Sequence, residues 1–115
     1  MNEQIKIPKI FFDLIDQIFE IERKVESLSE TNSISRNVSR LKEIFEHLES
    51  EGGLVYHNPI GEPYNETRTD LEASIAGNSA DSLIITEVIK PIVRYRKGGI
   101  TLIARKGIVV VESKS

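Results

Sequence analysis

Two stretches of the chain place apolar residues at alternating steps of three and four. This spacing is typical of helices that pack along their length. The stretch between them, residues 29–33, is rich in Ser, Thr and Asn and predicts a short connector, so the two helices should be antiparallel neighbours. Pro8 suits the start of the first helix, which should run to about Ser29, and the second should end near Glu51. The apolar seams are Phe11, Leu14, Ile18, Ile21, Val25 and Leu28, and then Ile34, Val38, Leu41, Phe45 and Leu48.

The hydrophobic pattern changes after Gly52-Gly53, a pair that could supply a left-handed helix cap. From here β-branched residues and turn formers dominate, with Pro91 predicting a bend and Lys97-Gly98-Gly99 a hairpin. The pattern predicts an α+β fold, with a helical hairpin over 1–51 and a β-domain of five or six short strands over 52–115. The helical seams need a cover, either a second pair of helices or the rest of this chain. The candidate strands are 54–56, 71–75, 83–89, 92–96, 100–104 and 108–112.

The composition of the chain argues against several classes of function. The 115 residues carry a formal net charge of −3, which argues against a general nucleic-acid binder. Residues 1–51 hold 11 acids and 7 bases, so the negative charge belongs to the helices. The chain has no Cys, which excludes disulfides and thiolate chemistry. We expect a cytoplasmic protein without a membrane segment, because no apolar run approaches the roughly 20 residues of a membrane span.

Candidate catalytic chemistry is sparse. His47 and Glu43 are four residues apart on the second helix, but a metal site needs several ligands at fixed spacing, and a surface histidine is the simpler interpretation. The carboxylates of the first helix alternate with Lys and Arg, as on a solvated face. No nucleophile elbow or phosphate loop is present. We therefore expect neither enzymatic activity nor a metal or cofactor.

Two features favour protein contacts. A basic cluster consists of Arg94, Arg96, Lys97, Arg105 and Lys106. It is interpreted either as edge-strand charges that prevent aggregation or as a docking patch. The loop 58–64 carries Ile60 and Tyr64, which either anchor a partner or pack on the chain's own sheet.

Several short segments, in order, resemble the bacterial nucleotide exchange factor family GrpE. Glu51-Gly52-Gly53-Leu54-Val55 is similar to the turn that follows the family's short helices. Tyr64-Asn65 and Leu71-Glu72-Ala73 resemble its Phe-Asp-Pro-x-x-His-Glu-Ala stretch, although Glu66 replaces the Pro and Leu71 the His. Residues 85–90 and 105–111 resemble two of its strands, although the family's Gly-Tyr pair and Pro-Ala pair are absent here. The resemblance runs from about Ile7 to the C-terminus and does not include the family's long N-terminal helix.

The resemblance implies a partner, the ATPase domain of a DnaK-type heat-shock chaperone, from which the family promotes ADP release. By position it implies contacts at Tyr64, Val88, Ile100, Arg105 and Val111, with charge supplied by Arg94, Arg96 or Lys97. It also implies a homodimer, in which two helical hairpins form a four-helix bundle. The expected dimer interface consists of Phe11, Leu14, Ile18, Ile21, Val25, Val38, Leu41, Phe45 and Leu48.

Two alternatives remain open. One is a dimeric interaction adaptor that keeps the fold without exchange activity, which the missing Pro-Ala and His positions favour. The other is a small enzyme, which would require a deep polar pocket with converging ionisable groups.

Overall fold

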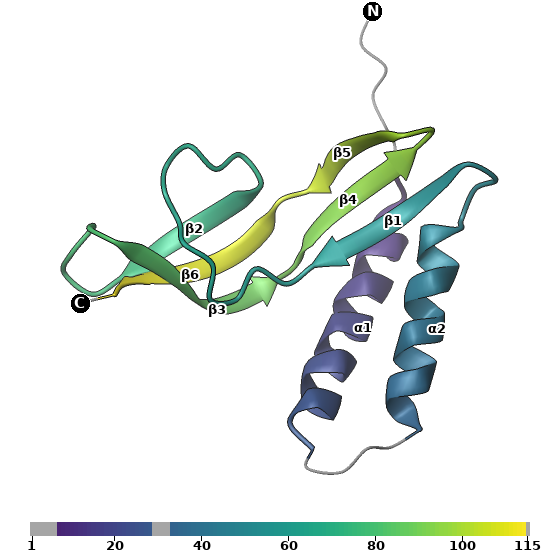
Figure 1. Ribbon diagram of the computed structural model, residues 1–115, viewed down its shortest axis with the longest axis horizontal. Helices are drawn as coiled ribbons and strands as arrows, with labels where there is room; N and C mark the ends of the chain where they lie inside the picture. Colours follow the sequence, from purple (N-terminus) through teal and green to yellow (C-terminus); the bar gives the residue numbers. More distant parts are fainter. Residues whose placement is uncertain (1–6, 29–32, 115) are drawn as a thin grey trace, which may run out of the picture.

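The fold is described from a computed structural model, in which residues 7–28 and 33–114 are placed. Helices α1 (Lys9–Glu26) and α2 (Ile34–Glu46) precede all the strands, which confirms the predicted α+β class and order of elements (Figure 1). Neither helix is long and apolar enough to cross a lipid bilayer. The strands are β1 (Gly52–His57), β2 (Leu71–Ala76), β3 (Leu83–Lys90), β4 (Ile92–Lys97), β5 (Ile100–Arg105) and β6 (Gly107–Ser113).

Both helices end earlier than predicted. The second was expected to reach Glu51, but a tight turn intervenes, in which Glu49 N–H donates to the Gly52 carbonyl at 2.9 Å and leads directly into β1. Gly52 and Gly53 do not cap the helix, because both lie in the extended strand. Glycine is required at these positions because β1 lies very close to its neighbours. A Cβ on Gly53 would lie 2.2 Å from the Phe45 carbonyl oxygen of α2. The predicted end of the first helix, Ser29, lies outside the described residues.

A long bent hairpin runs through both sheets. β4 and β5 pair on either side of the predicted turn, where Gly98 and Gly99 take positive φ values of 55° and 85°. The same two chain segments continue as β3 and β6, which pair with each other beyond a bend at Pro91 and Lys106. Pro91 therefore separates two strands, as predicted. The result is sheet A, with order β1-β4-β5, and sheet B, with order β2-β6-β3.

Sheet B contains one pairing that the sequence pattern does not predict. β2 runs parallel to β6, from Leu71 opposite Gly107 to Ala76 opposite Glu112. The loop before β2 covers the outer edge of β3, because Gly61 N–H donates to the Ile85 carbonyl at 2.9 Å and Tyr64 N–H to the Leu83 carbonyl at 3.0 Å. This loop therefore closes an edge that would otherwise be open to other strands.

The core is shared between helices and strands. One cluster joins both helices to Leu54 and Val93 of sheet A, and the other joins Phe19 of α1 to the inner face of sheet B. α1 thus packs on both sheets, while α2 packs on β1. The division at residues 51 and 52 marks the change from helix to strand, and each core draws on both sides of it.

The close contact at Gly53 gives a test of this packing. We expect Gly53→Ala to lower the free energy of unfolding by about 3 kcal/mol, because the added methyl group overlaps backbone atoms of α2. Gly61→Ala is the matched control: it adds the same group in open space at φ 81° and should cost only about 1 to 2 kcal/mol. Urea denaturation measures both values, and equal losses would contradict the close packing.

Candidate partner-binding surfaces

The inner face of the helical hairpin is buried against the strands. Three of the residues expected at the dimer interface, Ile18, Val38 and Phe45, are at most 8% exposed. Their placement in the dimer interface is therefore wrong, because they already pack with Leu54 and Val93 in the chain's own core. Sheet A provides the cover that the seam requires.

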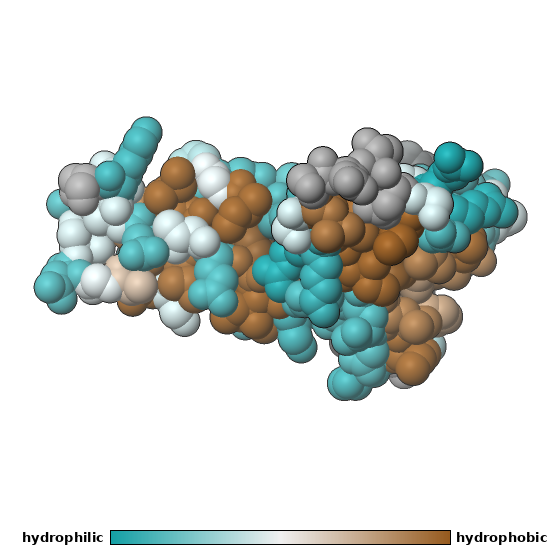
Figure 2. All heavy atoms as spheres, turned by 90° about the horizontal axis from the view of Figure 1, so that it is seen from below, coloured by the Kyte–Doolittle hydropathy of each residue, from teal (hydrophilic) through white to brown (hydrophobic). Residues whose placement is uncertain are grey.

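The outer face of the hairpin carries a second apolar row, which we call the outer stripe. Its members are between 37% and 59% exposed, and their spacing places them along one side of each helix. Figure 2 shows hydrophobic surface over this part of the molecule, on the right. Four predicted interface residues belong to the stripe, whereas Phe11 and Val25 are partly buried. The outer stripe consists of Ile10, Leu14, Ile21, Leu28, Ile34, Leu41, Ile44 and Leu48.

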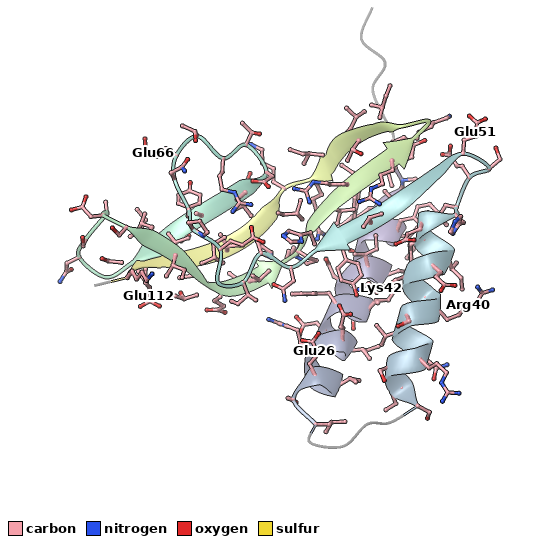
Figure 3. The ribbon with its side chains drawn as sticks, viewed as in Figure 1. Glu26, Arg40, Lys42, Glu51, Glu66 and Glu112 are labelled. Carbon is pink, nitrogen blue, oxygen red and sulfur yellow. The ribbon has the colours of Figure 1, made fainter. Side chains whose placement is uncertain are left out.

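A polar triad connects the two helices to β1. Glu22 of α1 accepts hydrogen bonds from Lys42 Nζ at 3.1 Å and from the Tyr56 hydroxyl at 2.8 Å. Lys42 extends from α2 toward α1, as Figure 3 shows, and its ammonium lies 5.0 Å from the centre of the Tyr56 ring. Burial, followed by the hydrogen bond to Glu22, raises the pKa of Tyr56 far above its ordinary value. Tyr56 therefore stays protonated, and its hydroxyl joins β1 to α1.

Some side chains of the predicted basic cluster form ion pairs within the chain, and others do not. Arg94 pairs with Asp70 at 3.1 Å, and Lys97 pairs with Glu49 at 3.4 Å. Arg96 is exposed at the surface of sheet A and has no ion pair among the described residues. At the other side of the turn, Ile100 is 64% exposed. Arg96 and Ile100 are thus the predicted contact residues that the fold leaves most accessible.

Arg105 is held within the chain. Its guanidinium donates to both carboxylate oxygens of Asp16, at 2.7 and 2.9 Å, and to the Pro91 carbonyl at 3.0 Å. It also lies 5.5 Å from the centre of the Phe12 ring. The side chain is 20% exposed, so its main contacts fix α1 to the bend of the long hairpin.

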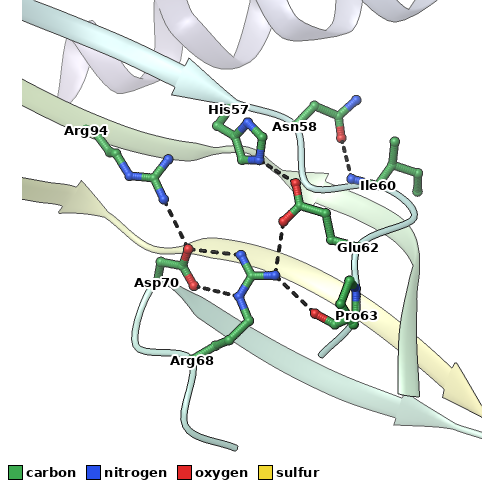
Figure 4. A network of polar contacts seen from close by, with 8 residues as sticks. All are labelled: His57, Asn58, Ile60, Glu62, Pro63, Arg68, Asp70 and Arg94. Atoms are coloured by element: carbon green, nitrogen blue, oxygen red, sulfur yellow. Dashed lines mark hydrogen bonds and ion pairs between the residues drawn. The ribbon is translucent and has the colours of Figure 1, made fainter. Parts of the chain in front are cut away.

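The loop between β1 and β2 is fixed by a network of charges (Figure 4). Arg68 donates to Asp70 at 3.0 and 3.1 Å and to Glu62 at 3.1 Å. Asp70 also accepts from Arg94 of β4, while Glu62 pairs with His57 of β1 at 2.5 Å. The hydrogen bond from Arg68 lowers the pKa of Asp70. Sequence reasoning missed this network, because no motif brings these separated positions together.

Two of the contact positions that the family resemblance implies are wrong, because their side chains do not reach the surface. Val88 and Val111 are 2% and 0% exposed, and they pack with Phe19 in the core of sheet B. Tyr64 is partly buried against the same core, so the loop packs on its own sheet, one of the two predicted possibilities. Ile60 of the same loop is 50% exposed.

The two histidines lie apart from one another. His47 Nδ1 is 2.9 Å from the Glu43 carbonyl, and His57 belongs to the charge network. In residues 7–28 and 33–114, no group of three or more His, Asp or Glu side chains is arranged to hold a metal ion. A groove of about 470 Å³ lies beside Tyr64 and Ile75, with Glu66 and Asp81 as its carboxylates. Both carboxylates are exposed, so the groove lacks buried ionisable groups that converge on one point.

Comparison of the chain with protein-family models, with curated proteins and with solved structures gave no match. The functional argument therefore depends on the surfaces described above.

The charge network predicts a pH-dependent loss of stability. We expect Asp70→Asn to lower the free energy of unfolding by about 1 to 2 kcal/mol at pH 7, because two arginines lose a charged acceptor. Since the folded protein holds the pKa of Asp70 below its ordinary value of 3.8, this contribution is complete above that value and disappears as the pH falls through the folded value. The difference between variant and parent should therefore shrink below about pH 4.

Urea denaturation at pH 7 and at pH 3 measures the difference. Glu66→Gln is the control, because Glu66 lies in the same loop with no ion pair among the described contacts, and Figure 3 shows it at the outside of the loop. A cost for Asp70→Asn that stays constant across this range would contradict the proposed charge interaction.

Proposed function

We propose that the chain is a GrpE-like co-chaperone that binds the ATPase domain of a DnaK-type heat-shock chaperone and promotes release of ADP. The observation that carries this proposal is the order and exposure of its parts. A helical hairpin with an exposed apolar outer stripe precedes six strands in two three-stranded sheets (Figure 1). The β4–β5 hairpin of sheet A exposes Arg96 and Ile100. This agrees with the order of parts that the sequence resemblance implies.

The proposed mechanism requires a rigid binding domain that has different affinities for the open and closed forms of the chaperone. A rigid domain that binds the open form of the nucleotide cleft more tightly than the closed form shifts the chaperone toward the open form, and ADP then leaves. The triad at Glu22 and the pair between Arg105 and Asp16 support such a domain, because they fix α1 to both α2 and the strands. Arg96 and Ile100 are the contact residues that we assign to the partner surface.

We assign the outer stripe to a homodimer. Two hairpins that pair along these stripes form a four-helix bundle, which removes the exposed Leu and Ile side chains from water. The acidic and basic side chains beside the stripe, such as Arg40 of α2, which points away from α1 in Figure 3, remain solvated in this arrangement.

The second candidate function is a dimeric adaptor without exchange activity. It is favoured by the positions of Val88 and Val111, which lie in the core, and by Arg105, which is held by Asp16. A chain that has lost these contacts can still bind a partner through the remaining surface without opening its cleft.

Release of fluorescent ADP from a DnaK-type chaperone of the same organism separates the two functions. We expect the full chain to accelerate release by roughly 5- to 150-fold, the range of ordinary coupling between sites. Arg96→Glu should reduce the acceleration, whereas Arg36→Glu, an exposed position on α2, should leave it unchanged. Binding to the ATPase domain without faster release, or binding to an unrelated protein, would select the adaptor, and absence of binding to any such chaperone would exclude the exchange function.

The dimer has its own test. Light scattering at micromolar concentration should give twice the chain mass of 13.0 kDa. Leu14→Glu combined with Leu41→Glu should give a monomer with unchanged circular dichroism, because both side chains are exposed in the single chain. Arg36→Glu changes the net charge by the same amount at an exposed position of α2 outside the stripe, and it should leave the dimer intact. A parent chain with a mass of 13.0 kDa would refute the assembly.

A further inference from the structure

The outer edge of β5 is open. β5 pairs with β4 on one side only, and among the described residues no other backbone group bonds to its second side. Figure 1 shows this strand at the margin of sheet A. An open edge presents unpaired N–H and C=O groups to any extended chain that approaches it.

The side chains of β5 distinguish this edge from the other two open edges, those of β1 and β2. Ile100, Leu102 and Ile103 are 64%, 46% and 42% exposed, and no charged residue occurs between Ile100 and Ala104. β2 exposes one large apolar side chain, Ile75, together with Glu72 and Ser74, and β1 exposes none. Natural edge strands usually carry charges that discourage pairing. β5 lacks them between Ile100 and Ala104, since most cations of the hairpin lie on the central strand β4 and Arg105 at the end of β5 is held by Asp16.

The surrounding charge defines the kind of chain that this edge accepts. Residues 88–111 contain six bases and no acid. The nearby acids Glu46 and Glu51 line a groove at the turn end of the hairpin, where Glu49 pairs with Lys97. Arg96 and Lys106 have no acidic partner among the described contacts, and Arg96 lies directly opposite Thr101 in the register of β4 and β5. A second copy of β5 would bring the same positive charges to this edge, and like charges oppose such pairing. A segment with acidic residues at its ends is attracted instead.

We propose that the outer edge of β5 binds an extended segment of the partner protein, apolar or β-branched at its centre and flanked by Asp or Glu, by adding it to sheet A as a fourth strand. Backbone hydrogen bonds supply the pairing in this mode, and alternate side chains supply selectivity. Alternate residues of the added strand lie beside Leu102 on the helix side of the sheet and beside Ile103 on the opposite side. This inference rests on the proposed function in one respect, since it takes the β4–β5 hairpin to be the partner surface.

The test uses a fluorescent eight-residue peptide with alternating valine and threonine at its centre and two glutamates at each end. We expect a rise in anisotropy on titration with the full chain, with new hydrogen-exchange protection confined to the amides of β5. A peptide with lysines in place of the glutamates should not bind. Two methylated versions of the peptide test the pairing, each with methyl groups on alternate backbone nitrogens. Methylation of the nitrogens that face β5 should abolish binding, and methylation of the other set should preserve it, because only one set of N–H groups faces β5.

Two variants complete the experiment. Arg96→Glu should weaken binding of the glutamate peptide by up to roughly fivefold, the effect of an exposed charge pair, while Arg36→Glu should not change it. Equal binding of the lysine peptide, or protection on β1 or β2 instead of β5, would overturn the inference. The peptide measurements contain no chaperone, so they are independent of the exchange function. If the peptide does not bind but ADP release is still accelerated, the inference about β5 is wrong and the exchange function stands. If the peptide binds but ADP release is not accelerated, the exchange function is wrong and the inference about β5 stands.

Discussion

The ion pair between Arg105 and Asp16 connects α1 to β5, across 89 positions of the sequence. It lies at the bend of the long hairpin, where the Pro91 carbonyl accepts a third hydrogen bond from the same guanidinium. A second arginine, Arg23 of α1, donates to the Val88 carbonyl at 3.0 Å on the other side of the bend. α1 is therefore fixed to both sheets by directional bonds as well as by the apolar contact of Phe19. Partly buried pairs of this kind contribute to the choice of one packing arrangement more reliably than to net stability.

This arrangement explains why the two faces of the helical hairpin differ in exposure. The inner face is buried against sheet A, so it stabilises the fold of the single chain. The outer stripe is not needed for that purpose and stays exposed. The apolar face of each helix is wide enough to include both the buried residues and the exposed stripe.

Local pattern predicts most of the elements but not how they meet. The positions of the six strands, the bend at Pro91 and the turn at Gly98 follow from β-branched runs interrupted by Pro and Gly, which act over a few residues. The early end of α2 could not be predicted, because it depends on the approach of Gly53 to the Phe45 carbonyl. The same holds for Val88 and Val111, because a transferred position does not say which face of a strand is covered. The charge network of Arg68, Asp70 and Arg94 arises only after the loop and β4 have met.

The place of β6 in sheet B has a consequence for biosynthesis. This strand follows every other strand in the sequence, yet it is the central one and pairs with both β2 and β3. Neither neighbour can complete its ladder before β6 has left the ribosome, and the parallel contact with β2 closes a long loop, which slows folding. β2 and β3 therefore have no central strand to pair with until the last strand of the chain is present, and their edges stay open until then.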